Sequence, residues 1–177
     1  MRAHLLDPTQ GDARLDKALA LGREIYRRYE AGEDCSASLE QLRVLSGQPI
    51  DVLDVSRAFG SIRPETFARE QLIAWNELPA DLACEEMLEM IELICQGESD
   101  ELQTGYWIAC LRLNTGDERI SDLICWPYEY SGEGGKTRML PADILSAALK
   151  SGKNGRRMPQ PEPLASAGGA RSADRDL

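Results

Sequence analysis

The chain has 177 residues, of which 42% are hydrophobic and 28% are charged. This composition supplies both a core and a solvated surface, and the length suits one ordinary domain or two small helical ones. No stretch approaches the roughly 20 apolar residues of a transmembrane helix, and the first residues lack the apolar region of a signal peptide. We therefore expect a cytoplasmic protein without membrane contact.

The net charge of −10 is unevenly distributed along the chain. Residues 81–135 carry 13 acidic and two basic side chains, whereas residues 136–177 carry eight basic and four acidic ones. An acidic stretch of this kind repels nucleic acid and attracts a cationic partner. A solvated acidic surface that serves solubility explains the same pattern, so charge alone leaves both interpretations open.

The five cysteines and the single histidine favour neither a disulfide framework nor a metal site. The cysteines are odd in number and form no CxxC pair, which predicts reduced thiols that pack as small apolar residues, Cys95 on a helical stripe among them. His4 lies in an N-terminal segment that we expect to be mobile, and a catalytic triad or a zinc site needs a histidine held on a scaffold. We expect no cofactor.

The spacing of apolar residues predicts four helices in the first half of the chain. The first covers residues 13–31, and Gly32 stops it. Ser38–Gln41 has the form of a capping box and opens a short helix that ends at Gly47. A third helix spans residues 50–59, and a fourth runs from Pro64 through Trp75.

A hinge at residues 76–81 separates this half from three further predicted helices. They cover residues 83–96, residues 99–114 and a segment opened by Leu140-Pro141. Ile120–Tyr130 has no clean periodicity, and Pro127 blocks continuation, so the pattern favours a loop or a single turn there.

The chain shows no strand pattern, and the predicted fold is all-α. We divide it into a helical N-terminal subdomain (1–78), a four-helix domain (79–150) and a disordered tail (151–177). The tail is predicted to be disordered because Gly, Pro, Ser, Ala and charge replace large apolar residues.

The segment Ser121-Asp122-Leu123-Ile124-Cys125-Trp126-Pro127 carries a family resemblance. Together with Met87–Cys95, Ser99–Asn114 and Pro141–Leu145, it resembles the four-helix immunity proteins that protect bacteria from E-type colicin and S-type pyocin DNases. In that family the motif leads into and forms a short third helix. The resemblance covers about 70 residues, from residue 84 to residue 150, and leaves residues 1–80 without a counterpart.

The resemblance implies a protein that binds a basic HNH-type nuclease beside its active site and excludes nucleic acid, without being an enzyme itself. The implied toxin-binding positions lie on the second helix and around the motif: Glu101, Thr104, Gly105, Ile108, Arg112, Asp122, Cys125, Trp126, Tyr128, Glu129 and Tyr130. Three of them have structural alternatives, since Trp126 suits a core, Asp122 suits a helix cap and Glu101 suits a first-turn charge.

Several positions depart from the family pattern. Cys125 stands where the family has an aromatic residue, and Gly105 and Arg112 replace apolar and acidic ones, which favours a different toxin. The loop at 131–138 is several residues longer than the corresponding loop of the family. Residues 1–80 are expected to support packing or to make a second contact with a larger toxin, and a diverged tandem repeat is the alternative.

Two other functions remain open on sequence grounds. An acidic chaperone or adaptor for a secreted effector suits the size, charge and helicity equally well, but it leaves the motif unexplained. An enzyme would need Cys125 or Cys95 as its nucleophile. The acidic surroundings disfavour this because they raise the pKa of a thiol.

Overall fold

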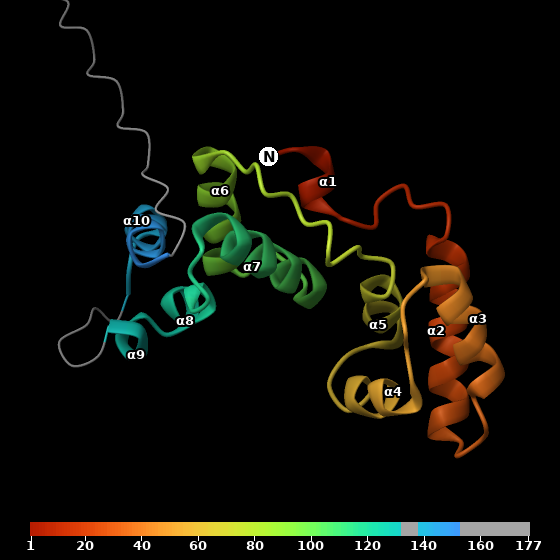
Figure 1. The fold of residues 1–177 in the computed structure, drawn as a ribbon. Coiled ribbons are helices and arrows are strands. Elements are labelled where there is room, and N and C mark those ends of the chain that lie inside the picture. The colour runs from red at the N-terminus through yellow and green to blue at the C-terminus, as the bar shows by residue number, and fades with distance from the viewer. Residues whose placement is uncertain (132–137, 153–177) are drawn as a thin grey trace, which may run out of the picture.

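The computed structural model describes residues 1–131 and 138–152, and within these ranges it consists of helices and their connections, with no strand (Figure 1). The predicted all-α fold is confirmed. Each helix in these ranges is too short or too polar to cross a membrane. The helices are α1 (Ala3–Leu6), α2 (Leu15–Glu30), α3 (Ser36–Ser46), α4 (Val52–Ala58), α5 (Pro64–Glu70), α6 (Cys84–Gln96), α7 (Glu101–Thr115), α8 (Ile120–Cys125), α9 (Pro127–Ser131) and α10 (Pro141–Ser151).

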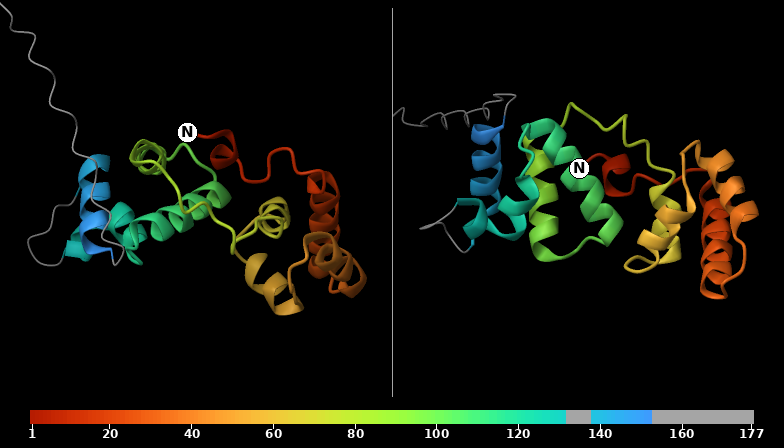
Figure 2. Two further views of the ribbon diagram at one scale, coloured as in Figure 1. Left: turned by 45° about the horizontal axis from the view of Figure 1, so that its top comes forward. Right: turned by 60° about the horizontal axis from the view of Figure 1, so that its bottom comes forward.

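The side chains pack into two apolar clusters, one at each end of an elongated molecule (Figure 2). The N-terminal core lies among α2, α3, α4 and α5 and contains Ile25, Leu42, Val55 and Phe67. Here α2 packs closely against α5. A Cβ atom on Gly22 would lie 2.7 Å from the Pro64 carbonyl oxygen, so the close approach of these two helices requires glycine at that position.

The C-terminal core is formed by α6, α7, α8 and α10 around fully buried Met90, Leu111, Leu123 and Leu145. Each of these helices buries one face because its sequence is amphipathic. Burial of the apolar stripe stabilises the fold by about 25 cal/mol for each Å² of apolar surface removed from water. Left-handed glycines at positions 97 and 116 end α6 and α7.

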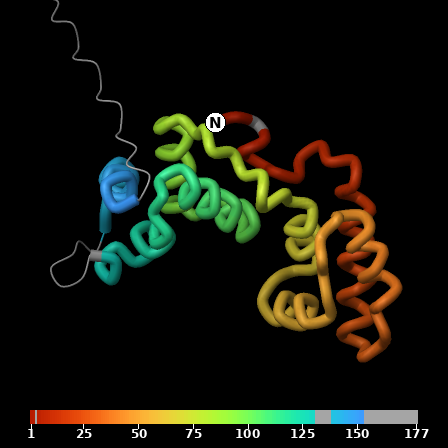
Figure 3. The backbone as a smooth tube through the Cα atoms, viewed as in Figure 1, coloured from red at the N-terminus to blue at the C-terminus, as the bar shows by residue number. Residues whose placement is uncertain are grey.

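The N-terminal segment belongs to the C-terminal core, and so does Ile73, whereas the N-terminal core draws on residues from Ala18 to Leu72. Figure 3 shows the chain passing from α1, beside α6 and α7, across to α2. Leu5 is fully buried, and its carbonyl oxygen accepts hydrogen bonds from Gln103 Nε2 at 2.9 Å and Trp107 Nε1 at 2.6 Å. The expected mobility of this segment is therefore wrong, because buried contacts anchor it to α7, while His4 itself is exposed.

Two helix boundaries in the N-terminal half differ from the prediction. Helix α3 begins at Ser36, whose backbone N–H donates to the Asp34 carboxylate at 2.9 Å, and Ser38 is buried inside the helix rather than capping it. Helix α5 ends at Glu70, five residues before Trp75. Buried Leu72 and Ile73 follow it in turns, which shows that tertiary burial overrides the helical spacing there.

In the C-terminal half, residues 120–130 form the short helices α8 and α9 instead of the loop or single turn that the periodicity favoured. A short helix at this motif is what the family resemblance implied. Ile120 and Leu123, one helical turn apart, are both fully buried, and this pair stabilises a helix too short to show a periodic pattern. Cys95 is exposed instead of packing as an apolar residue. The long loop expected at residues 131–138 lies mostly within 132–137, and the disordered tail expected at 151–177 lies mostly within 153–177; both of these ranges are outside the described residues. Ser151, the first residue of the expected tail, belongs to α10 instead.

Candidate protein-binding surface

The family-like motif forms α8 and the start of α9, with Trp126 at the junction. The Trp126 N–H donates to the Asp122 carbonyl oxygen at 2.7 Å and closes α8. Trp126 itself leaves the helical conformation, with φ −136° and ψ 60°, because the residue before a proline is excluded from the α region. Pro127, which is buried, then begins α9, and Tyr130 at the other side of α9 packs against the C-terminal core.

Two large aromatic side chains stand on the surface at this junction. Trp126 is 57% exposed and Tyr128 is 50% exposed, and Cys125 and Glu129 beside them are also exposed. Trp126 is therefore not a core residue. Exposed aromatic side chains of this size are enriched at protein interfaces, where their burial supplies much of the binding free energy.

Tyr130, by contrast, has a structural role. Its hydroxyl donates to Asp117 Oδ2 at 2.8 Å, and Ser151 Oγ lies 2.7 Å from the same carboxylate oxygen. The Arg119 guanidinium lies 5.0 Å from the centre of the Tyr130 ring. These contacts fix α9 against the end of α10 and the α7–α8 connection.

Asp122 is paired within the chain. Its carboxylate accepts a hydrogen bond from Arg119 Nε at 3.0 Å, and it does not cap α8, which has no side-chain cap. The same carboxylate affects its neighbour Cys125. Partial burial raises the pKa of the Cys125 thiol, and the negative charge of Asp122 raises it further.

A cavity of about 420 Å³ lies next to the exposed aromatic side chains. It is open to solvent between the end of α6, the end of α8 and the start of α10. Its apolar wall includes Ile124, Met139, Leu140 and Pro141. The projecting aromatic pair and the recessed apolar wall together provide a surface to which a partner can be complementary in shape.

The predicted positions on α7 are divided between the two ends of the helix. Arg112 is exposed near its C-terminal end, with Nε 3.6 Å from Glu118 Oε2, and Ile108 is half-buried at mid-helix. Thr104 is tied to Ser99 by a hydrogen bond of 2.7 Å between their hydroxyls. Glu101 and Gly105 are exposed in the first turns of α7. With a rise of 1.5 Å per residue, they lie about 21 Å and about 15 Å from the last residue of α7, which precedes α8.

The structure thus brings the motif residues together on α8 and α9. Arg112 lies near the end of α7 that precedes α8, where it pairs with Glu118. The structure places Glu101 and Gly105 elsewhere, at a cavity that they share with Thr66 and Glu70 of α5. Figure 1 shows α5 beside one end of α7. The link is Arg69 of α5, whose Nη1 donates to Asp100 Oδ2 at 3.0 Å. Asp100 is the N-cap of α7 and also accepts from the Gln103 N–H at 2.8 Å, so the pair holds α5 at the start of α7.

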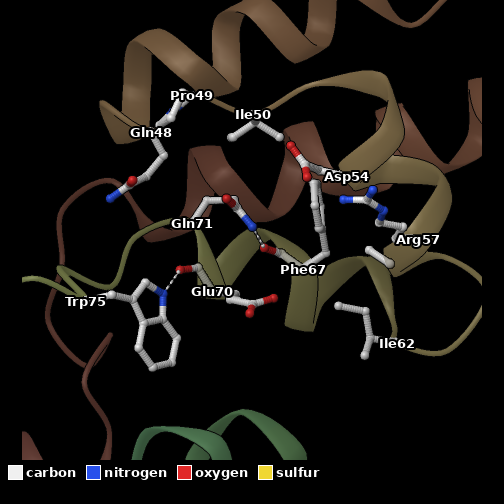
Figure 4. A pocket seen from close by; sticks show the side chains of 11 residues that line it. Gln48, Pro49, Ile50, Asp54, Arg57, Ile62, Phe67, Glu70, Gln71 and Trp75 are labelled. Atoms are coloured by element: carbon white, nitrogen blue, oxygen red, sulfur yellow. Dashed lines mark hydrogen bonds between the residues drawn. The ribbon is translucent and has the colours of Figure 1, made fainter. Parts of the chain in front are cut away.

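Sequence reasoning missed the residues that face Glu101 and Gly105. A small cavity of about 100 Å³ lies there, and Ile62, Glu70 and Trp75 from the N-terminal half line it. The same three residues line a larger adjoining cavity of about 460 Å³ (Figure 4). The only sequence signal is a tryptophan directly before a polar hinge, and the expected helix assigned that tryptophan to a core.

Comparisons with family models, with curated proteins and with solved structures return no match. Within residues 1–131 and 138–152, no three His, Cys, Asp or Glu side chains gather in a way that would hold a metal ion. The class of protein therefore rests on the structure itself. It is an all-α protein with an exposed aromatic pair, Trp126 and Tyr128, after α8, and with a small cavity at the start of α7.

Proposed function

We propose that this chain is an immunity protein that binds a basic nuclease toxin and inhibits it. The observation that supports this most directly is the exposure of Trp126 and Tyr128 at the helix junction of the family-like motif. A soluble surface seldom exposes two neighbouring large aromatic side chains without a binding role. The exposed position of the motif residues is what a protein-binding interface requires.

The charge of the surrounding surface supports the same function. Glu129 is exposed beside Tyr128, and Glu92 lines the cavity next to the aromatic pair. Glu85, Glu98 and Glu118 are further exposed carboxylates of the C-terminal half. A nuclease presents a Lys/Arg-rich surface to DNA, and an acidic surface is complementary to it. Long-range attraction accelerates the encounter, and aromatic burial then slows dissociation.

Inhibition of this kind needs no catalytic group. The chain would cover a basic surface beside the HNH-type centre, and its bulk and negative charge would keep nucleic acid away from that centre. The cysteines are consistent with this function, since burial raises the pKa of Cys95 and Cys125 alike and so disfavours a reactive thiolate.

The test is inhibition of DNA cleavage. The probe is the purified Lys/Arg-rich nuclease domain encoded by the reading frame next to that of this chain, mixed with the full chain at increasing molar ratio. We expect cleavage of plasmid DNA to stop near equimolar chain. Uninhibited cleavage at a tenfold molar excess would contradict the proposal.

A second measurement separates an inhibitor from an acidic chaperone. Calorimetric binding to the nuclease domain without any loss of cleavage would indicate a chaperone or adaptor. Binding that is weakened by Trp126→Ala, with cleavage restored in parallel, would indicate an inhibitor that acts through the motif. Trp126→Phe provides the conservative control, because it keeps an aromatic ring at the junction.

A further inference from the structure

The cavity between α5 and α7 contains a glycine that the fold does not need. Gly105 lies inside α7 with ordinary helical geometry, and a Cβ atom added there would meet nothing within 4 Å. Glycine inside a helix is less stabilising than alanine, because its backbone loses more conformational freedom on folding. Packing gives no reason for this cost, in contrast to Gly22. The absence of a side chain keeps the cavity open to a group from outside.

The aromatic wall of this cavity is held in place. Trp75 Nε1 donates to the Glu70 carbonyl oxygen at 3.3 Å, and the Trp75 ring lies edge-on to Tyr106 with centroids 6.4 Å apart. The indole nevertheless remains 37% exposed. An aromatic face that is already fixed loses little conformational freedom when a ligand packs on it.

Two carboxylates face the same cavity, Glu70 from α5 and Glu101 from α7. Within the described ranges, neither forms an ion pair. The nearest arginine along the chain, Arg69, is directed to Asp7 and Asp100 instead. Figure 4 shows the Glu70 carboxylate between Trp75 and Ile62, with Arg57 beside Asp54 on the far side of the adjoining cavity.

The pKa of Glu70 is raised, and among the described residues no nearby cation lowers it. Burial raises the pKa of its carboxyl group, and repulsion from Glu101 raises it further. A cation placed between the two carboxylates would relieve this repulsion. Charge and shape thus point to the same class of occupant.

We propose that the groove formed by Ile62, Glu70, Trp75, Glu101 and Gly105 receives an arginine side chain of the basic nuclease. A guanidinium stacks on an indole face and forms hydrogen bonds to carboxylates in its own plane, which suits one aromatic wall and two acids. This inference rests on the proposed function. It gives the N-terminal half a role, because α5 and Trp75 extend the binding surface to the far end of α7.

The first test uses a small probe and does not depend on the nuclease. Nα-acetyl-arginine amide is titrated into the ¹⁵N-labelled full chain, and the Trp75 indole N–H resonance, assigned with Trp75→Phe, is followed. We expect a saturable shift of that resonance and none with Nα-acetyl-citrulline amide, a neutral analogue of the same shape. Glu70→Gln and Gly105→Leu should remove the shift, whereas Glu77→Gln, an identical charge change outside the groove, should keep it. An unmoved Trp75 resonance, or equal shifts with both amides, would overturn the proposal.

The second test uses the nuclease domain. Glu70→Gln should raise Kd about tenfold or more, and Glu77→Gln should change it less than about twofold. If Trp126→Ala weakens binding while Glu70→Gln does not, the groove is no part of the interface and the proposed function still stands. If the unaltered chain neither binds nor inhibits, the proposed function fails, and the amide titration still decides whether the groove binds a guanidinium.

Discussion

Arg69 Nη1 and Asp100 Oδ2, 3.0 Å apart, connect the two halves of the molecule. The same guanidinium donates from Nη2 to Asp7 Oδ1 at 3.1 Å and from Nε to the Thr9 hydroxyl at 3.1 Å. Three segments that are distant in sequence therefore meet on one side chain. The position of α5 relative to α7, and with it the groove at Glu70 and Glu101, depends on this contact.

Replacing Arg69 should loosen that connection. We expect Arg69→Ala to lower the free energy of unfolding by about 1–3 kcal/mol, because it leaves partly buried acceptors without their charged donor. Arg63→Ala, an exposed arginine one residue before α5, is the matched control and should be nearly neutral. Urea unfolding followed by circular dichroism measures both. Equal losses for the two variants would contradict the structural role of Arg69.

Two tryptophans should respond in opposite ways. Trp126→Ala should weaken nuclease binding by at least about 2 kcal/mol and leave stability almost unchanged, because the side chain is mostly in solvent. Trp107→Ala should lower stability by about 3–5 kcal/mol, because Trp107 is buried and bonded to Leu5. Calorimetry and thermal unfolding measure the two effects. Loss of stability in Trp126→Ala would instead assign that residue a packing role.

Salt should slow association with the nuclease. The attraction between an acidic surface and a basic one is screened over about 10 Å at 0.1 M ionic strength and about 3 Å at 1 M. We expect the association rate in stopped-flow fluorescence to fall steeply between these conditions while the dissociation rate changes little. An association rate that is independent of salt would argue against electrostatic steering.

Acid should detach the N-terminal segment from α6. The Arg2 guanidinium lowers the pKa of Glu86 to about 2, and the Ala83 N–H also donates to this carboxylate. Since the pKa is depressed in the folded state, the stabilisation is present above the unfolded value, about 4.3, and is lost as pH falls toward 2. Glu86→Gln should therefore flatten the dependence of stability on pH in this window. An unchanged acid-unfolding profile would contradict the assignment.

Glu70 should show the opposite sign. Burial, and then Glu101, raise the pKa of Glu70, so folding is favoured below the unfolded pKa and this advantage is lost as pH rises through the folded one. Glu70→Gln should thus leave stability at pH 7 equal or slightly higher, by about 1–2 °C in Tm, while it weakens arginine binding. A clear drop in Tm would show that the carboxylate stabilises the fold.

Helices α6 and α7 could be predicted from sequence, because they end at left-handed glycines and carry local apolar stripes. The family resemblance also placed Trp126 and Tyr128 at the implied interface, and both side chains are exposed. The groove could not be predicted, since Glu70 and Glu101 are brought together only by the packing of α5 on α7. The end of α5 at Glu70 could not be predicted either, because Leu72 and Ile73 continue the helical spacing of apolar residues although the helix has already ended.

The carbonyl oxygen of Leu5 has a consequence for how the chain is made. Its two hydrogen-bond donors, Gln103 and Trp107, follow it by 98 and 102 residues. During synthesis the segment around Leu5 must wait until α7 has left the ribosome, several seconds later at about 5–20 residues per second. The N-terminal core can form in that interval from local contacts. Docking of α1 should therefore be a late, separate step in folding, and one that a refolding experiment would detect as a slow change in Trp107 fluorescence.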